Sequence, residues 1–122
     1  MNPLVLDESD RELLTEIRTV CRGISCSAAK IKPKRIVLYD DGFWFESFLQ
    51  PLERIGNLTC ALSQEFREAT RSVFPWGLVA LLQTVTWVLN HYANRRIEWE
   101  IITKDLPLLT EFCDRWLETG TQ

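Results

Sequence analysis

The sequence predicts one globular α+β domain over residues 1–122, with its elements in the order α-β-β-β-α-β-α. Apolar residues recur at helical spacing near both ends of the chain. Between them, β-branched and aromatic residues flank Asp41-Gly42, which is a strong hairpin signal. The composition, 46% hydrophobic and 25% charged, is that of a globular protein. We therefore expect a three-stranded antiparallel meander plus a fourth strand, packed on a central buried helix.

The first helix is expected to begin at a capping box and to end at a glycine. Ser9 can accept a hydrogen bond from the amide of Glu12, whose side chain can reach back to the amide of Ser9. Apolar residues then recur on one face until Gly23, which predicts an amphipathic helix. These apolar residues are Leu13, Leu14, Ile17, Val20 and Cys21.

The middle of the chain is expected to form the meander. Its β-branched and aromatic residues, bounded by turn-forming residues, are typical of strands. The expected strands cover 35–39, 43–50 and 58–66, with Pro51 ending the second and a turn at Gly56-Asn57 before the third.

A long helix over 68–92 is expected at the centre of the fold. Pro75 suits its first turn, and apolar residues on several of its faces are typical of a buried helix. A fourth strand is expected over 97–102, where apolar residues alternate with glutamates. Asp105 is expected to cap the last helix. The apolar stripe of that helix consists of Leu108, Leu109, Phe112, Cys113, Trp116 and Leu117.

Three short motifs resemble the ribonuclease H-like fold. They are LYDDG at 38–42, similar to the first-strand motif of that family; WGLVALLQTVTWVL at 76–89, similar to its central helix; and EIITKD at 100–105, similar to its fourth strand. The resemblance implies a metal-dependent nuclease with Asp41 and Asp105 as catalytic residues and Mg²⁺ as cofactor. The chain departs from the family at Gly77, where the family carries a glutamate, so an inactive relative fits the resemblance as well.

The two acids Asp40 and Asp41 have a second interpretation as a hairpin turn, because aspartate tolerates a left-handed backbone and glycine often follows it. In that interpretation the protein is not an enzyme. It is a small interaction, assembly or chaperone-type protein that needs no cofactor and binds another protein or a second copy of itself. Size, acidity and element order also resemble the secretion-chaperone type of fold.

Aromatic residues favour this interaction function. Phe43 and Phe45 lie on one face of the expected second strand, and Trp44 and Phe48 lie on the other. One face can pack under the helices, whereas the other needs cover from a helix of this chain or from another chain. Trp44, Phe48 and Trp99 are therefore candidate interface residues.

Charge and cysteine content narrow the class of protein further. The net charge of −3 argues against nucleic acid as a partner. The one basic cluster is either a solvated linker or a small anion-binding patch, formed by Lys30, Lys32, Lys34 and Arg35. The four cysteines form no CxxC pair, which disfavours zinc and indicates reduced thiols in the cytoplasm. We expect neither a signal peptide nor a membrane span.

Overall fold

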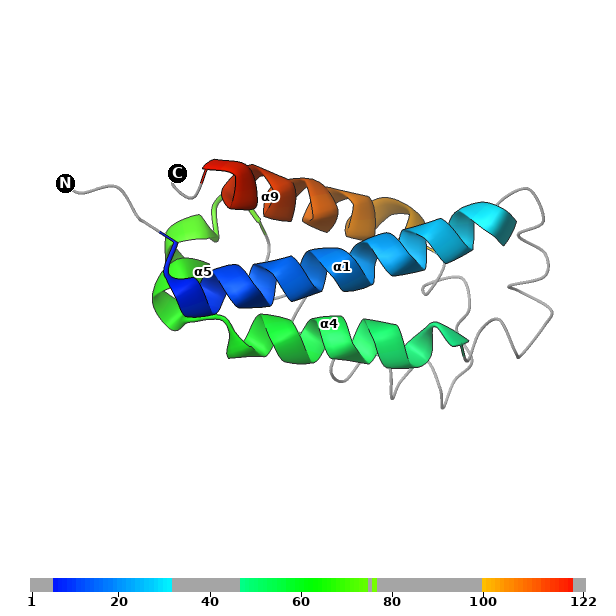
Figure 1. Ribbon diagram of the computed structural model, residues 1–122, viewed down its shortest axis with the longest axis horizontal. Coiled ribbons are helices and arrows are strands. Elements are labelled where there is room, and N and C mark those ends of the chain that lie inside the picture. Colours follow the sequence, from blue (N-terminus) through cyan, green and yellow to red (C-terminus); the bar gives the residue numbers. More distant parts are fainter. Residues whose placement is uncertain (1–5, 32–46, 75, 77–99, 120–122) are drawn as a thin grey trace.

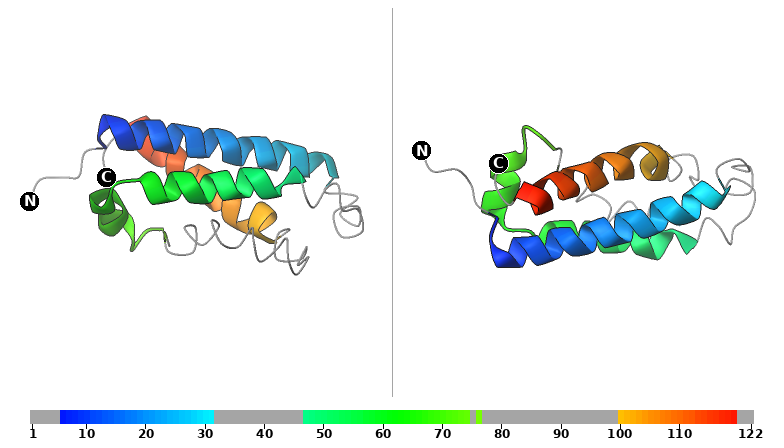
Figure 2. Two further views of the ribbon diagram at one scale, coloured as in Figure 1. Left: turned by 90° about the horizontal axis from the view of Figure 1, so that it is seen from below. Right: turned by 45° about the horizontal axis from the view of Figure 1, so that its top comes forward.

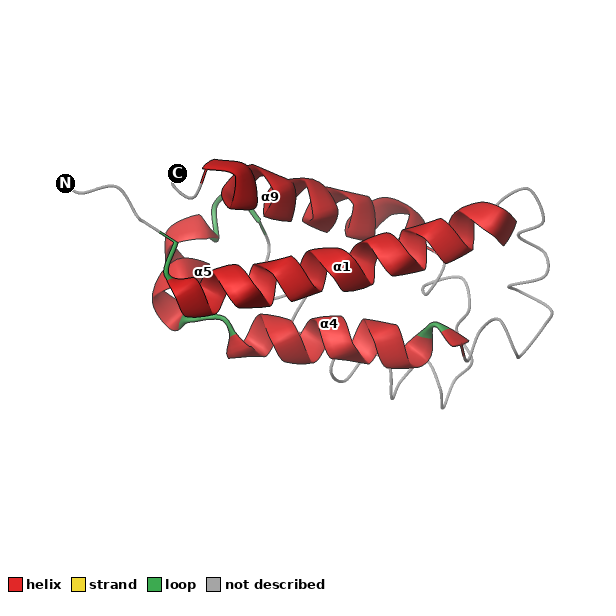
Figure 3. Cartoon of the chain, viewed as in Figure 1, coloured by secondary structure: helices red, strands yellow, loops and turns green. Residues whose placement is uncertain are grey.

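The computed structural model describes residues 6–31, 47–74, 76 and 100–119, and helices are the only regular structure in that part of the chain (Figure 3). The longer helices are α1 (Glu8–Ile31), α4 (Leu49–Ala61) and α9 (Leu106–Thr119). The shorter ones are α5 (Gln64–Thr70) and the π-helical segment η2 (Ile101–Asp105). The α+β class expected from the sequence is therefore wrong, because the described segments that were expected as strands are helical.

Helix α1 is the centre of the arrangement. It lies between α4 and α9 and contacts both (Figure 1). Both neighbours run antiparallel to α1, and the views in Figure 2 agree on this. Helix α5 crosses the end of the bundle at which α1 begins, and η2 leads directly into α9 and also contacts α1. The described helices thus share a single buried core.

The start of α1 is capped by Asp7 rather than by Ser9. The carboxylate of Asp7 accepts a hydrogen bond from the amide of Asp10 at 2.9 Å, and its carbonyl accepts from the amide of Arg11 at 2.9 Å. Asp7 therefore satisfies amides that the first helical turn leaves without a partner. Glu8 and Asp10 also place negative charge in that turn, where the helix dipole favours it.

The end of α1 lies beyond Gly23, so the expectation that this glycine terminates the helix is wrong. The apolar face continues past it with Ile24 and Ala28, which are 3% and 5% exposed. A glycine inside a helix costs about 1 kcal/mol relative to alanine. Burying an isoleucine side chain contributes about 1.5–3 kcal/mol, which is enough to offset that cost and to keep the helix intact up to Ile31.

The expected third strand is also wrong. Residues 58–66 form the end of α4, a break at Leu62-Ser63 and the start of α5. Buried residues across α4 and α5 recur at helical spacing, namely Leu52, Ile55, Thr59, Leu62 and Phe66.

The residues expected to form turns at the ends of this strand and of the second strand also lie in a helix. Pro51 lies in the first turn of α4, where its missing amide removes no bond within the helix. Gly56 and Asn57, expected as a turn, lie inside α4. At the end of the expected second strand, Ser47 and Phe48 lie directly before this helix, and the carbonyl of Phe48 accepts from the amide of Leu52 at 3.1 Å.

The C-terminal region differs from its expectation in the same way. Ile101 and Ile102, expected in the fourth strand, lie in η2, so the EIITKD motif is helical where the ribonuclease H-like resemblance implied a strand. Asp105 does not cap α9, because the backbone passes from η2 into α9 with helical angles at Leu106 (φ −65°, ψ −38°). Within the expected stripe, Leu108 is 60% exposed and points away from the core.

Several expected elements lie outside the described residues. These are the strand over 35–39, residues 43–46 of the second strand, residues 97–99 of the fourth, and residues 77–92 of the long helix. The described start of that long helix differs from the expectation, since α5 ends at Thr70 and a turn follows over 71–73.

Aromatic side chains build the core where α5 and its following turn meet α9. The cluster consists of Phe66, Phe74, Trp76, Phe112 and Trp116, with centroids of contacting rings 5.0–6.4 Å apart. The Trp76 indole donates to the hydroxyl of Thr70 at 2.8 Å, and that hydroxyl donates to the carbonyl of Phe66 at 2.8 Å. The buried polar atoms of this cluster are therefore hydrogen-bonded, as burial requires.

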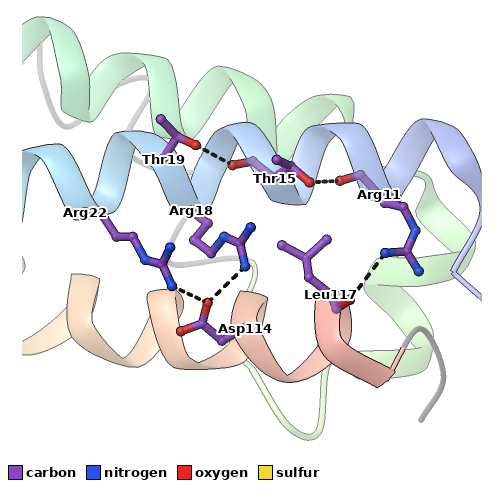
Figure 4. A network of polar contacts seen from close by, with 7 residues as sticks. All are labelled: Arg11, Thr15, Arg18, Thr19, Arg22, Asp114 and Leu117. Atoms are coloured by element: carbon purple, nitrogen blue, oxygen red, sulfur yellow. Dashed lines mark hydrogen bonds and ion pairs between the residues drawn. The ribbon is translucent and has the colours of Figure 1, made fainter.

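Polar contacts fix how α1 and α9 lie against each other (Figure 4). Arg18 and Arg22 both contact Oδ1 of Asp114, at 3.2 and 2.8 Å, and Arg11 donates to the carbonyl of Leu117 at 3.3 Å. The Arg22 side chain is 57% exposed, and exposed pairs of this kind contribute about 0–1 kcal/mol. They set the register of the two helices, while apolar burial stabilises the contact.

Candidate binding groove

A groove with a volume of about 980 Å³ runs between α1 and α4. The second half of α1 forms one wall, and most of α4 with the two residues before it forms the other. The two walls lie side by side because the helices are antiparallel neighbours. The volume is at the upper end of the range of about 300–1,000 Å³ for ligand pockets, and the groove is open rather than enclosed.

The floor of the groove is apolar. Ile24 of α1 and Phe48 before α4 are each 3% exposed and belong to the core. Val20 and Leu58 are half-buried and pack against the same core. Val20 and Ile24 are four residues apart and so share one side of α1. The apolar face of α1 is thus wide enough to line the groove as well as to pack on α9.

The rim of the groove is polar and carries charge on the α4 side. Glu53 and Arg54 are exposed lining residues. Arg54 forms an ion pair with Glu16 of α1, which joins the two walls; the side chains are 56% and 41% exposed, so the pair contributes less than about 1 kcal/mol. No cation pairs with Glu53 within the described part of the chain. Among the described residues, one negative charge of the rim therefore has no cationic partner.

Gly23 leaves a notch in the α1 wall. A Cβ atom built on this glycine meets no atom of a neighbouring element within 4 Å, and its backbone is not in the left-handed region that requires glycine. The residue lies inside α1 and lines the groove. Neither packing nor backbone geometry in the described residues accounts for a glycine here.

We expect Gly23→Ala to raise the free energy of unfolding by about 1 kcal/mol, because alanine favours the helix and meets no obstacle. Urea denaturation measures this change. The difference between Cys26→Ala and Cys26→Gly, at an exposed position of the same helix, gives the matched local cost of a glycine. A destabilised Gly23→Ala protein would show that the notch is filled.

The candidate residues from the sequence are spread over different parts of the molecule. Phe48 is buried and lines the groove, so it lies at the candidate site, although in a helical rather than a strand environment. Lys30 is exposed in the last turn of α1, where the helix dipole favours a cation. The remaining candidates lie outside the described residues and stay predictions: Asp41, Trp44, Trp99, Lys32, Lys34 and Arg35.

Asp105 lies at the end of η2, away from the groove. Desolvation raises the pKa of its carboxyl group; Lys104 opposes this shift and Glu100 adds to it. Among residues 6–31, 47–74, 76 and 100–119, no three Asp, Glu, His or Cys side chains form a group that could hold a metal ion. The Mg²⁺ alternative also requires Asp41, outside these residues, so it remains an untested prediction.

The cysteines divide into buried and accessible ones, and all are free thiols. Cys21 of α1 and Cys113 of α9 are fully buried, whereas Cys26 is exposed and Cys60 is half-buried. Burial raises the pKa of the Cys21 thiol to about 12, and the pKa of Cys113 is raised further by the same cause. Both therefore stay protonated at neutral pH and act as small apolar core residues.

Thiol labelling should follow this division. Iodoacetamide is expected to modify Cys26 first and Cys60 more slowly, and to reach Cys21 and Cys113 only after denaturant is added, because the thiolate is the reacting species. Mass spectrometry of the modified peptides over time measures the order. Early labelling of Cys113 would contradict the packing of α1 against α9.

The groove was not predicted from the sequence. Its residues on α1 include Val20, Gly23 and Ile24, and the helix was expected to end at Gly23, so Ile24 was not assigned to it. A usable signal was present: Ile24 and Ala28 continue the apolar spacing of Ile17 and Cys21.

None of the helices in the described residues combines the length and the apolar character that a membrane span requires.

Comparison with known proteins identifies no relative. No protein-family model matches the sequence, and no curated protein and no solved structure is significantly similar to it.

Proposed function

We propose that this protein is a non-catalytic interaction module that binds another protein through the groove between α1 and α4. The observation that carries the proposal is the groove itself, with its apolar floor and polar rim. Protein interfaces combine an apolar centre with a polar, solvent-accessible edge in the same way.

The walls of the groove are fixed by packing against the core. Ile24 and Phe48 are fixed in the core, and α1 is held from its other side by α9. A surface that is ordered before binding loses little conformational entropy when a partner arrives. The groove can therefore bind without a folding step in the described helices.

The charge of the chain and its thiols support the remaining parts of the proposal. A net charge of −3 does not suit the phosphate backbone of nucleic acid, and the apolar groove suits a protein partner better. Four free cysteines suit a reducing compartment, and we place the protein in the cytoplasm on that basis.

A peptide library displayed on phage tests this function. Peptides are selected on the full-length protein and then tested against Gly23→Leu, which projects a side chain into the groove, and against Cys26→Leu, which adds the same side chain to an exposed position of α1 outside the groove lining. We expect selected peptides that lose binding to Gly23→Leu and retain binding to Cys26→Leu. Circular dichroism confirms that both variants are folded.

The proposal would be wrong if no peptide were enriched, or if the enriched peptides bound the Gly23→Leu protein as well as the wild type. Either result would mean that the groove between α1 and α4 is not a binding surface for polypeptide.

A further inference from the structure

We infer that the groove binds an amphipathic helix which carries a lysine or arginine beside its apolar stripe, an inference that rests on the proposed function. Four observations lead to this partner: the length of the groove, the chemistry of its walls, the notch at Gly23, and the charge of Glu53, which has no cationic partner among the described residues.

The groove has the length of a short helix. Its lining extends from Val20 to Ser27 on α1, and from Ser47, two residues before α4, to Leu58 within α4. At a rise of about 1.5 Å per residue, these walls are about 10 and 16 Å long, or roughly two to three helical turns. An open groove of this length leaves a small molecule largely in water, whereas a helix can cover the half-buried side chains of Val20 and Leu58 together.

The walls favour a helix over an extended peptide. An extended peptide binds well where a sheet edge offers unpaired amides and carbonyls. Here both walls are helices, whose backbone groups are bonded within α1 and α4. A peptide in this groove must therefore satisfy its own backbone hydrogen bonds, and a helix does so without help from the walls.

The notch at Gly23 permits a close approach. The distance between two packed helices depends on the side chains at their contact. Gly23 has no side chain, and nothing else in the described residues occupies the space beside it. A ligand helix that crosses α1 at this position can lie close to the backbone of α1. This contact would explain the glycine, which the packing within the described residues does not explain.

The charge of the rim selects a cationic helix. Glu16 neutralises Arg54, while Glu53 has no cationic partner among the described residues. A lysine or arginine on the ligand, beside its apolar stripe, can approach Glu53 at the edge of the groove. Rim charges of this kind contribute more to specificity and to the association rate than to affinity.

Three synthetic peptides test the inference on the full-length protein. Each is an alanine-based, fluorescein-labelled sequence of about four helical turns with leucines at helical spacing. The first carries lysines beside the stripe, the second carries glutamates there, and the third is the lysine peptide with a proline inside the stripe. Fluorescence anisotropy gives the dissociation constants, and chemical shifts of the Val20, Ile24 and Leu58 methyl groups locate the bound peptide.

We expect the lysine peptide to bind about 1.4- to fivefold more tightly than the glutamate peptide, since an exposed ion pair contributes about 0.2–1 kcal/mol. Glu53→Lys should reverse the order of the two peptides, and the proline peptide should bind at least about tenfold more weakly because proline breaks the helix. Gly23→Leu should weaken all binding, whereas Cys26→Leu should not.

Other results would overturn the inference in distinguishable ways. Binding of the proline peptide as tightly as the lysine peptide, or a preference for the glutamate peptide that Glu53→Lys does not change, would reject a basic helix. If such binding were still lost with Gly23→Leu, the proposed function would be supported, but with a different ligand.

Sedimentation velocity tests another occupant. A wild-type dimer that Gly23→Leu dissociates would show that a second copy of the chain occupies the groove. Peptide binding that Gly23→Leu leaves unchanged would reject both the inference and the proposed function.

Discussion

Replacing Phe112 with alanine is expected to lower the free energy of unfolding by about 3–5 kcal/mol. Phe112 of α9 is 3% exposed and lies at the centre of the aromatic cluster. Its ring centroid is 5.1 Å from those of Phe74 and Trp76, 6.2 Å from that of Phe66 and 6.4 Å from that of Trp116. Alanine would leave a void bounded by rigid rings, which cannot collapse to fill it, so the loss should lie near the upper end of the range.

Urea denaturation, followed by tryptophan fluorescence and circular dichroism, measures the effect of Phe112→Ala. Leu108→Ala is the matched control, because Leu108 lies on the same helix and is 60% exposed. The control should change the free energy of unfolding by less than about 0.5 kcal/mol. Two variants of equal stability would contradict the assignment of the buried and exposed faces of α9.

The sequence predicted the two terminal helices because their apolar residues repeat at helical spacing. Leu14, Ile17 and Cys21 of α1 are buried as expected, and so are Phe112 and Trp116 of α9. The errors lie at the helix boundaries, where one local signal was weighted above the periodicity. Gly23 does not end α1 because the residues that follow it still have a core to enter.

The expected strand over 58–66 was predicted from residue type rather than from spacing. Residues 58–66 contain apolar and aromatic residues bounded by turn signals, which suited a strand. In the structure the buried positions are Thr59, Leu62 and Phe66, three and four residues apart, and that period belongs to a helix. Tertiary packing thus overrides β-propensity here, and the spacing that shows this extends back to Leu52, across the expected turn at Gly56.

The candidate site was harder to predict than the fold because it is formed between two helices. Val20 and Leu58 are far apart in the sequence, and neither carries a reactive group. Of the aromatic residues that suggested an interface, Phe48 lies in the groove floor, whereas Trp44 and Trp99 lie outside the described residues. The contact between α1 and α4 belongs to the tertiary structure, and the sequence pattern of neither helix alone predicts it.

Asp10→Ala is expected to lower the free energy of unfolding by about 3 kcal/mol, because it removes two hydrogen bonds to a buried carboxylate. Asp10 is 4% exposed. One of its oxygens accepts from the amide of Ser63 at 2.8 Å, and the other accepts from the Ser63 hydroxyl at 2.6 Å. The hydroxyl oxygen in turn accepts from the amide of Phe66 at 3.1 Å and so caps α5. Asp10 therefore ties the start of α1 to the start of α5.

A double-mutant cycle separates this contact from general damage to α1. Asp10→Ala, Ser63→Ala and the double variant are compared by urea denaturation, with Glu12→Ala as the control at an exposed position in the same turn. We expect a coupling energy of at least about 1 kcal/mol between Asp10 and Ser63, since the second substitution removes the donor that the first left without its acceptor. Glu12→Ala should stay within about 0.5 kcal/mol of the wild type. Additive losses at Asp10 and Ser63 would mean that the carboxylate stabilises α1 alone, and that α5 is held in place only by its aromatic contacts.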